Sequence, residues 1–413
     1  MMNSIIPIFH PHSSLIRRIL PVEKTLSVGL IGIGNMGSAH ATMVGSGQIQ
    51  GLRLAAVCDI DPARLKMCME KNPSVTGYEN WQDLVADPSL DVVIVAVPHP
   101  LHADMAMAAL TAGKHVLVEK PVDITVTKAA KLNEVAKASG KVFGIMFNQR
   151  TNPLFARARD MVKNGELGQL QRSVWIITNW FRTQSYYDSG TWRATWSGEG
   201  GGVLLNQAPH NLDLWQWICG MPTEITAFCD IAKYHNIEVE DDVTIFARYA
   251  NGATGTFLTS TGESPGTNRL EITGTLGKVV IEEGVLKHWK LKKDVMEVCR
   301  EHPDSFVAAD FDYEEIPQTD PETAHPGILQ NFANAILHGE ELLAPGTDGI
   351  YELSISNAAY LSSARGNTPV KLPLNGQDFD DLLSSLIRMS HAKNNDPDSK
   401  YNTTYHQRWQ VRW

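Results

Sequence analysis

The chain has 413 residues, of which 43% are hydrophobic and 20% charged; this is ordinary globular composition and excludes a disordered or fibrous protein. Its 36 Lys and Arg residues against 46 Asp and Glu residues give a formal net charge of −10, so the sequence lacks the basic surplus of a general nucleic-acid binder. The five cysteines form no CxxC pair, which excludes a disulfide framework and a zinc module and favours a reducing, cytoplasmic location.

Short apolar runs alternate with helical segments over residues 25–147. The runs expected to be strands are Ser27–Ile31, Leu52–Cys58, Asp91–Val97, His115–Val118 and Lys141–Met146. The segments of helical character are Ser38–Gly45, Pro62–Lys71, Leu101–Ala112 and Val126–Ser139. This alternation predicts right-handed crossovers and an α/β domain with a doubly wound parallel sheet of the Rossmann type.

The pattern changes after residue 147. Longer segments alternate polar with apolar residues, as at Val243, Ile245 and Ala247, and turn signals such as Asn251-Gly252 separate them. The expected strands are Leu170–Phe181, Glu224–Ala232, Asp242–Ala250, Ala253–Ser260 and Asn268–Ile281, and the expected helices are Leu204–Ile218, Pro326–Leu337 and Gly349–Arg365. We expect a second α/β domain over residues 148–393, in which helices cover one face of a large, open, mostly antiparallel sheet.

Two terminal segments flank these domains. Residues 1–24 carry Arg17 and Arg18 after the apolar part, an order that does not fit a secretory signal. We interpret them as an extension and residues 394–413 as a polar tail. No apolar run reaches the roughly 18 residues of a membrane span, so we expect no membrane partner.

A glycine motif joins the first strand to the first helix. Gly32, Gly34 and Gly37 permit a tight turn and a close backbone approach, so a pyrophosphate can bind the N–H groups at the helix start, with Asn35 and Met36 between the glycines. Asp59 ends the second strand, where it can accept hydrogen bonds from ribose hydroxyls. Its negative charge favours NAD; nearby Arg64 keeps NADP as the alternative.

The fourth strand ends in Glu119-Lys120-Pro121, at the edge where open α/β sheets bind ligands. A lysine there can stabilise the alkoxide that forms as hydride leaves a substrate. The alternative is an ordinary surface lysine.

A second motif runs from the glycine triplet Gly200–Gly202 to Asp213. Spacings of four and three place Asn206, His210 and Asp213 on one helical face. Pro209 fits this pattern only in a first helical turn. His210 is a candidate acid/base because imidazole titrates near physiological pH, although a structural histidine is the alternative.

Together these motifs resemble the Gfo/Idh/MocA oxidoreductases over about residues 27–373. The resemblance rests on Gly32-x-Gly34-x-x-Gly37, Pro98 with His102, Glu119-Lys120-Pro121, Gly200–Gly202 and the Asn206-to-Asp213 run. It implies a Rossmann domain, a C-terminal domain with an open sheet, a homodimer or homotetramer packed through that sheet, and oxidation or reduction of a secondary alcohol on a sugar, inositol or related polyol with NAD(P). It also places Pro98, His102, Glu119 and Lys120 at the cofactor and makes Lys120 and His210 the catalytic pair.

One residue departs from the pattern of the family. The position usually held by an aspartate, four residues before the histidine, is Asn206. Asparagine cannot accept a proton, so we expect it only to orient substrate. His210 then acts alone or through water, and Asp213 is the candidate to orient its ring.

The remaining substrate contacts are expected from polar and aromatic residues. We assign Asn148, Arg150, Trp192, Arg193, Asn206 and Gln207 to substrate, with Tyr186 and Tyr187 nearby, since amide and guanidinium groups match hydroxyls and flat aromatic faces suit sugar rings. Trp196 flanks Arg193 and is assigned with it. Of the other tryptophans in this stretch, we expect Trp215 and Trp217 in the core, and Trp175 and Trp180 in a strand that packs at a subunit interface.

The predicted function is hydride transfer between NAD and a secondary hydroxyl or keto group of a sugar, glycoside or inositol. Two alternatives stay open: a redox-neutral enzyme that retains its NAD and uses transient oxidation to cleave a glycoside, and a non-catalytic NAD-binding regulator. We expect a sugar or polyol substrate, no nucleic-acid partner and no metal, because no His/Cys/Asp/Glu cluster shows ligand spacing.

Overall fold

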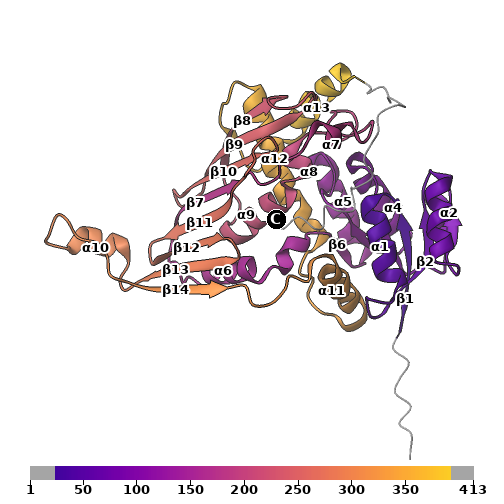
Figure 1. The fold of residues 1–413 in the computed structure, drawn as a ribbon, viewed down its shortest axis with the longest axis horizontal. Helices are drawn as coiled ribbons and strands as arrows, with labels where there is room; N and C mark the ends of the chain where they lie inside the picture. Colours follow the sequence, from indigo (N-terminus) through magenta and orange to yellow (C-terminus); the bar gives the residue numbers. More distant parts are fainter. Residues whose placement is uncertain (1–23, 392–413) are drawn as a thin grey trace, which may run out of the picture.

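Two β-sheets and the helices around them make up residues 24–391, the part of the chain that the computed structural model describes (Figure 1). The predicted polar tail and, except for Lys24, the predicted N-terminal extension lie outside the described residues. The predicted domain boundary at residue 147 falls between the two sheets in the sequence, after the last strand of the first and before the first strand of the second.

The first sheet has six parallel strands in the order β3-β2-β1-β4-β5-β6. The strands are β1 (Leu26–Ile31), β2 (Leu52–Cys58), β3 (Thr76–Tyr78), β4 (Val92–Val95), β5 (His115–Val118) and β6 (Phe143–Ile145). Their buried apolar residues confirm the predicted doubly wound sheet. Strand β3 was not predicted, because its three residues are exposed or half-buried and form no apolar run.

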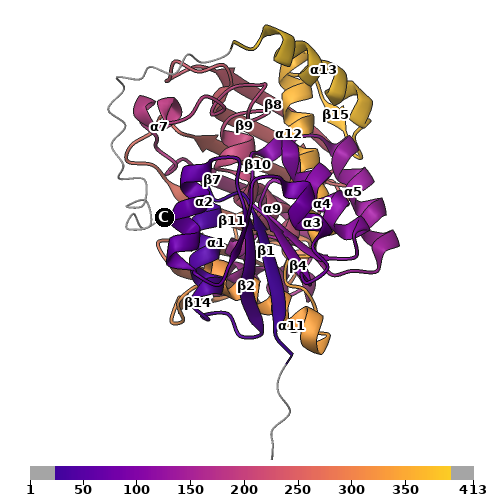
Figure 2. The same ribbon diagram turned by 90° about the vertical axis from the view of Figure 1, so that its right-hand side faces the viewer.

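Helices cover both faces of this sheet (Figure 2). One face carries α1 (Asn35–Gly45) and α2 (Pro62–Lys71), and the other carries α3 (Trp81–Ala86), α4 (His102–Thr111) and α5 (Val126–Ser139). Reversal of the strand order at β1 and β4 leaves the loops after these two strands side by side, with the loop after β5 next to them. This is the switch point at which doubly wound sheets bind ligands.

The second sheet has nine strands in the order β14-β13-β12-β11-β7-β10-β9-β8-β15. Its strands are β7 (Leu170–Ile177), β8 (Glu224–Ile231), β9 (Glu240–Arg248), β10 (Thr254–Ser260), β11 (Asn268–Gly274), β12 (Gly277–Glu282), β13 (Val285–Leu291), β14 (Phe311–Pro317) and β15 (Val370–Lys371). Only β7 and β10 pair in parallel, so the predicted mostly antiparallel sheet is confirmed.

Helices pack on one face of the second sheet, between it and the first (Figure 1). They include α6 (Pro153–Lys163), α9 (Pro209–Cys219) and α12 (Gly349–Ala364); α11 (Ala324–His338) and α13 (Gly376–Met389) lie at its margins. Val243, Ile245 and Ala247 of β9 are fully buried, whereas Phe246 between them is exposed. The sheet therefore has one covered and one open face, as the alternating pattern predicts. In the described part of the chain, no helix has the length and apolar character that crossing a membrane requires.

The predicted helix Leu204–Ile218 is two helices. Helix α8 (Val203–Asn206) ends at Asn206, and α9 begins at Pro209, its first residue. Proline has no N–H and fits the first turn of a helix, so the chain restarts there. The prediction of a single helical face for Asn206, His210 and Asp213 is therefore wrong, whereas Pro209 lies in a first turn as expected.

Candidate active site

The glycine motif forms the turn from β1 into α1. Gly32 has φ +90°, and a Cβ on it would lie 2.3 Å from the carbonyl oxygen of Ala96. A Cβ on Gly37 would lie 1.8 Å from the carbonyl oxygen of Gly32. Only glycine fits both positions, so backbone and helix start come as close as a bound pyrophosphate requires. Asn35 and Met36 are the first two residues of α1, with Gly34 as its N-cap.

Asp59 ties the end of β2 to this turn. Its Oδ2 accepts a 2.6 Å hydrogen bond from the Ile33 amide and its Oδ1 a 2.9 Å bond from the Asp61 amide. Asp59 is 7% exposed, and the hydrogen bond from Ile33 places its charge beside the dinucleotide turn. Arg64, by contrast, is an exposed residue whose guanidinium is 3.3 Å from the Asp61 carboxylate. The negative group at the turn fits the ribose of NAD and opposes a 2′-phosphate.

Glu119, at the end of β5, forms a buried hydrogen-bonded pair with His40 of α1. His40 Nε2 lies 2.7 Å from Glu119 Oε1, and the two side chains are almost entirely buried. Burial would raise the pKa of Glu119, but the hydrogen bond and charge of His40, with His325 and Lys120, hold it well below its usual value. Glu119 therefore connects the end of β5 to α1, the helix that follows the dinucleotide turn. Sequence reasoning missed His40, because 79 residues separate the partners.

His102 bridges the loops after β4 and β5. Its Nδ1 lies 2.6 Å from the Pro121 carbonyl oxygen and its Nε2 2.7 Å from the Val97 carbonyl oxygen. Both ring nitrogens thus contact the backbone, so the predicted cofactor contact is replaced by a scaffold role that fixes the loop after Lys120. Pro98, beside this bridge, is exposed at the end of β4, where it can face a cofactor.

Lys120 joins the first sheet to the end of α8, three residues before α9 begins. Its Nζ donates a 2.6 Å hydrogen bond to the main-chain carbonyl of Asn206. His210 is the second residue of α9 and is half-buried. The structure thereby links the two predicted catalytic segments, which are 86 residues apart at this contact.

Arg150 and Asp213 form a bidentate ion pair in the helical layer, with Nε–Oδ2 2.8 Å and Nη2–Oδ1 2.7 Å. Arg150 Nη1 also donates to Asp348 and to the Leu343 carbonyl, and the side chain is 1% exposed. A guanidinium engaged in this way cannot bind substrate, so the predicted substrate role of Arg150 is wrong. Asp213 also accepts from Gln216, so its predicted role in orienting the His210 ring is wrong too.

Arg193 lies between two aromatic rings. Its Cζ is 4.4 Å from the Tyr186 ring centre and 4.6 Å from that of Trp192, distances that favour cation–π attraction. Arg193 Nη1 and Gln207 Nε2 both donate to the Tyr186 hydroxyl, at 2.6 and 3.1 Å. Four residues assigned to the substrate pocket from sequence therefore form one cluster.

Two amide oxygens of the predicted substrate set have no hydrogen-bond partner within residues 24–391. They are Oδ1 of Asn148, just after β6, and Oε1 of Gln207, and both are buried. A buried acceptor without a donor carries a free-energy cost that a bound hydroxyl would remove. Both residues fit their predicted role as substrate contacts.

Four other tryptophans between residues 175 and 217 are core residues. Trp196 is 6% exposed and packs against Tyr360, with ring centres 5.6 Å apart, so its predicted substrate role is wrong. Trp175 is fully buried and donates to Asn268, and Trp180 is 7% exposed and donates to Asn211. Neither can pack at a subunit interface as predicted. Trp215 is buried, as expected.

Two buried glutamates missed by the sequence reasoning lie beside the glycine triplet, one in space and one in the sequence. Glu240 of β9 accepts from the amides of Gly202 and Leu204, at 2.9 and 3.0 Å, and from the Tyr360 hydroxyl. Glu199 directly precedes the triplet and is 1% exposed. Burial raises the pKa of Glu240 to about 7. No local pattern indicated Glu240, since its contacts come from α8 and α12.

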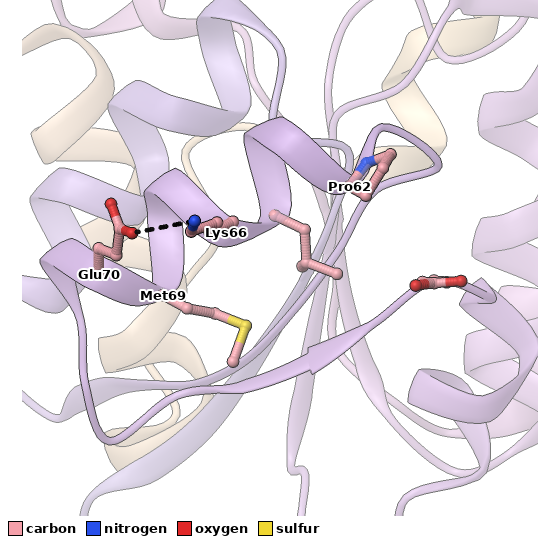
Figure 3. A pocket seen from close by; sticks show the side chains of 6 residues that line it. Pro62, Lys66, Met69 and Glu70 are labelled. Atoms are coloured by element: carbon pink, nitrogen blue, oxygen red, sulfur yellow. Dashed lines mark ion pairs between the residues drawn. The ribbon is translucent and has the colours of Figure 1, made fainter.

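A separate hollow of about 440 Å³ lies over α2 and is lined by Pro62, Leu65, Lys66, Met69, Glu70 and Glu79 (Figure 3). Lys66 and Glu70 make an exposed ion pair across its rim. No residue of the predicted catalytic or substrate set lines this hollow, so we assign it no part in the site.

Comparison with known proteins agrees with this geometry. Residues 26–147 match the model of an oxidoreductase family with an NAD-binding Rossmann fold, and residues 155–280 match the GFO/IDH/MocA C-terminal domain. The scyllo-inositol 2-dehydrogenase (NAD(+)) of Bacillus subtilis is 27% identical over 85% of this chain and 97% of its own length. The levoglucosan dehydrogenase of Pseudarthrobacter phenanthrenivorans is 28% identical over 62% of this chain and 73% of its own length.

A solved structure extends the likeness to three dimensions. The WlbA dehydrogenase of Chromobacterium violaceum, in complex with NADH and UDP-GlcNAcA, superposes with a TM-score of 0.73 and 25% identity over 86% of this chain and 98% of its own. The dinucleotide turn and the aspartate at the end of β2 agree with the matches to both family models. The chain therefore belongs to the Gfo/Idh/MocA family and is an NAD-dependent oxidoreductase.

Proposed function

We propose that this enzyme transfers a hydride between NAD and a secondary hydroxyl or keto group of a sugar, glycoside or inositol. The observation that carries the proposal is the 2.6 Å bond from Lys120 Nζ to the Asn206 carbonyl. This bond holds the Lys120 side chain from the cofactor sheet at the end of α8, three residues before the helix that carries His210. The named relatives act on a cyclic polyol and an anhydro sugar by their names, which supports the same substrate class here.

Lys120 lowers the energy of the charged substrate. As a secondary alcohol is oxidised, its oxygen gains negative charge, and an ammonium group beside it stabilises that charge. The ammonium group of a lysine has three N–H donors, so it can bond the Asn206 carbonyl and a substrate oxygen at the same time. NAD, when bound at the glycine turn, supplies the nicotinamide ring that exchanges the hydride.

His210 moves the proton. A neutral imidazole takes the proton of the hydroxyl during oxidation and returns it during reduction. Its position in the first turn of α9, four residues beyond the Asn206 carbonyl that holds Lys120, supports this role. Asn206 contributes the main-chain oxygen that positions Lys120 and accepts no proton.

The substrate ring lies against the cluster around Arg193. Trp192 is half-buried and offers an aromatic face, and the unsatisfied oxygens of Asn148 and Gln207 accept hydroxyl protons. This combination of one flat face and several hydrogen-bond acceptors suits a ring with many hydroxyls.

The test follows NADH absorbance with NAD or NADP and a panel of sugars, glycosides, inositols and their keto forms. We expect turnover with NAD, and a loss of at least about a hundredfold in Lys120→Ala and His210→Ala. Lys131→Ala and His338→Ala, at exposed positions of α5 and α11, are the matched controls. Full turnover in both site variants would refute the catalytic pair.

The same panel separates the alternatives. A redox-neutral enzyme would release cleaved glycoside without net NADH, which chromatography of the products detects. A regulator would bind NAD but convert no substrate, and Lys120→Ala would change nothing.

A further inference from the structure

The side chain of Asn206 lies against a buried carboxylate. Its Nδ2 donates to Oε1 of Glu199, whose side chain is 1% exposed. Glu199 comes from the loop just before Gly200–Gly202, seven residues from Asn206. A charged group at this depth needs hydrogen-bond donors and an opposite charge around it.

We propose that Glu199 is the positioning residue of the active site: its carboxylate sets the orientation of Asn206 and, through it, the positions of Lys120 and Arg193. This inference rests on the proposed function. Glu199 thereby supplies, from the neighbouring loop, the negative charge that position 206 lacks in this chain.

The contacts of Glu199 require a carboxylate. Oε1 accepts from Asn206, and Oε2 accepts a 2.6 Å bond from the Ala194 amide. Arg193 Nη1 lies 3.8 Å from Oε1 and supplies the opposite charge. A glutamine has one acceptor oxygen and one NH₂ group, so it would turn a donor toward one of these two donors.

The pairing with Glu199 also decides which way the Asn206 amide points. Both Glu199 oxygens accept hydrogen bonds, so Nδ2 of Asn206 faces the carboxylate, and Oδ1 faces the other way and accepts a 3.3 Å bond from the Tyr186 hydroxyl. That hydroxyl in turn accepts from Arg193, which is paired with Glu199. Glu199, Asn206, Tyr186 and Arg193 therefore form a closed ring of contacts.

This ring reaches both halves of the proposed site. Asn206 presents its main-chain oxygen to Lys120, so a shift of residue 206 moves the ammonium group. Tyr186 and Arg193 carry the aromatic cluster assigned to substrate. Loss of the carboxylate is expected to disturb the chemical step and substrate binding together.

The experiment is a double-mutant cycle with Glu199→Gln, Asn206→Asp and the double variant. Glu199→Gln turns a donor toward a donor, and Asn206→Asp places two carboxylates in contact; we expect each to lower kcat/KM by about tenfold to a hundredfold. In the double variant the amide oxygen introduced at position 199 accepts from Ala194, and the NH₂ group of the same side chain donates to the new carboxylate. We therefore expect recovery to within about threefold of the parent enzyme.

The matched control is Glu134→Gln, at an exposed position of α5, which should change nothing. A purely structural Glu199 would lower thermal stability in Glu199→Gln while kcat of the folded enzyme stayed unchanged, and this result would overturn the proposal. A double variant no better than the worse single variant would also overturn it.

Thermal unfolding of the same four proteins keeps this test separate from the proposed function. If no substrate in the panel is converted, the proposed function is wrong. The melting temperatures of the variants still measure the coupling between residues 199 and 206. Both single variants should then melt lower than the double variant. Additive changes in the melting temperature would show that residues 199 and 206 are uncoupled.

Discussion

Arg150 and Asp213 are joined by two hydrogen bonds, 2.7 and 2.8 Å long, at a place where both side chains are 1% exposed. Arg150 follows β6 of the first sheet, and Asp213 lies on α9 against the second. A third member, Asp348, accepts a 2.8 Å bond from Arg150 just before α12. Burial would lower the pKa of Arg150, but the charges of Asp213 and Asp348 raise it above its usual value. The network therefore holds the helix of His210 to the cofactor sheet as a charged unit.

Replacement of Arg150 should destabilise the fold rather than weaken substrate binding. Arg150→Met leaves Asp213 buried without its partner, a change expected to cost about 3–5 kcal/mol. The matched control is Arg157→Met, which breaks the half-buried, solvent-accessible bidentate pair of Arg157 with Glu166 and should cost about 1 kcal/mol. Urea unfolding followed by circular dichroism measures both. Equal losses in the two variants would contradict a structural role that is special to Arg150.

The outcome at Arg150 shows where sequence reasoning succeeds and where it stops. Local patterns predict the parallel sheet, because its longer strands are mostly apolar. They also predict the dinucleotide turn, because glycines and an acidic residue lie at fixed spacings. Strand β14 has no apolar run in its sequence, since almost all of its residues are exposed. Helix α6 did have a signal: an Asn152 cap, Pro153 in the first position and apolar residues at helical spacing.

No local sequence pattern can predict which distant segments contact each other. Arg150 next to a strand end has the same appearance in sequence whether it faces substrate or a buried aspartate 63 residues away. His40 with Glu119, and Glu240 with the glycine triplet, are further pairs of this kind. The residue types of the site are thus readable from sequence, whereas the partner of each charged group is set by the packing of the two sheets.

Asp59 should determine the preference for NAD. Asp59→Asn removes the negative charge that opposes a 2′-phosphate and weakens the hydrogen bond from Ile33. We expect the Kd for NADH to rise about tenfold and the ratio of NADPH to NADH affinity to shift toward NADPH. Fluorescence titration with both cofactors measures these constants.

The control for this change is Asp61→Asn, which alters an exposed carboxylate paired with Arg64 at the start of α2. It should leave the cofactor ratio as it is. If both variants shifted the ratio equally, general electrostatics rather than the position of Asp59 would set the preference.

Trp192 and Trp196 should behave as different kinds of residue, although both flank Arg193. Trp192→Ala removes an aromatic face from the proposed substrate cluster, and we expect KM to rise several-fold, from a contact of about 1 kcal/mol, with little change in melting temperature. Trp196→Ala opens a cavity beside Tyr360 and should lower stability by about 3–5 kcal/mol. Steady-state kinetics and thermal unfolding of both variants check the contrast, and a stability loss confined to Trp192→Ala would reverse the assignment.

Glu352 should make the stability of this enzyme depend on pH. It lies on α12, fully buried, and neither carboxyl oxygen has a hydrogen-bond partner in the described residues. Burial, helped by the charge of Asp213 and opposed by that of Lys120, raises its pKa well above the usual value. The folded state therefore keeps the proton at a pH where the unfolded chain has lost it.

The sign of the effect follows from this difference. Below about pH 4.3, the ordinary pKa of a glutamate, both states carry the proton and Glu352 contributes its full stability. As the pH rises toward the folded pKa, ionisation favours the unfolded chain, and stability falls by about 1.4 kcal/mol per pH unit. Glu352→Gln cannot ionise, so we expect it to match the parent enzyme near pH 4 and to exceed it increasingly up to neutral pH. Urea unfolding between pH 4 and 8, with the exposed Glu341→Gln as control, measures the difference; parallel curves for Glu352→Gln and the parent would show that Glu352 is ionised in the folded enzyme.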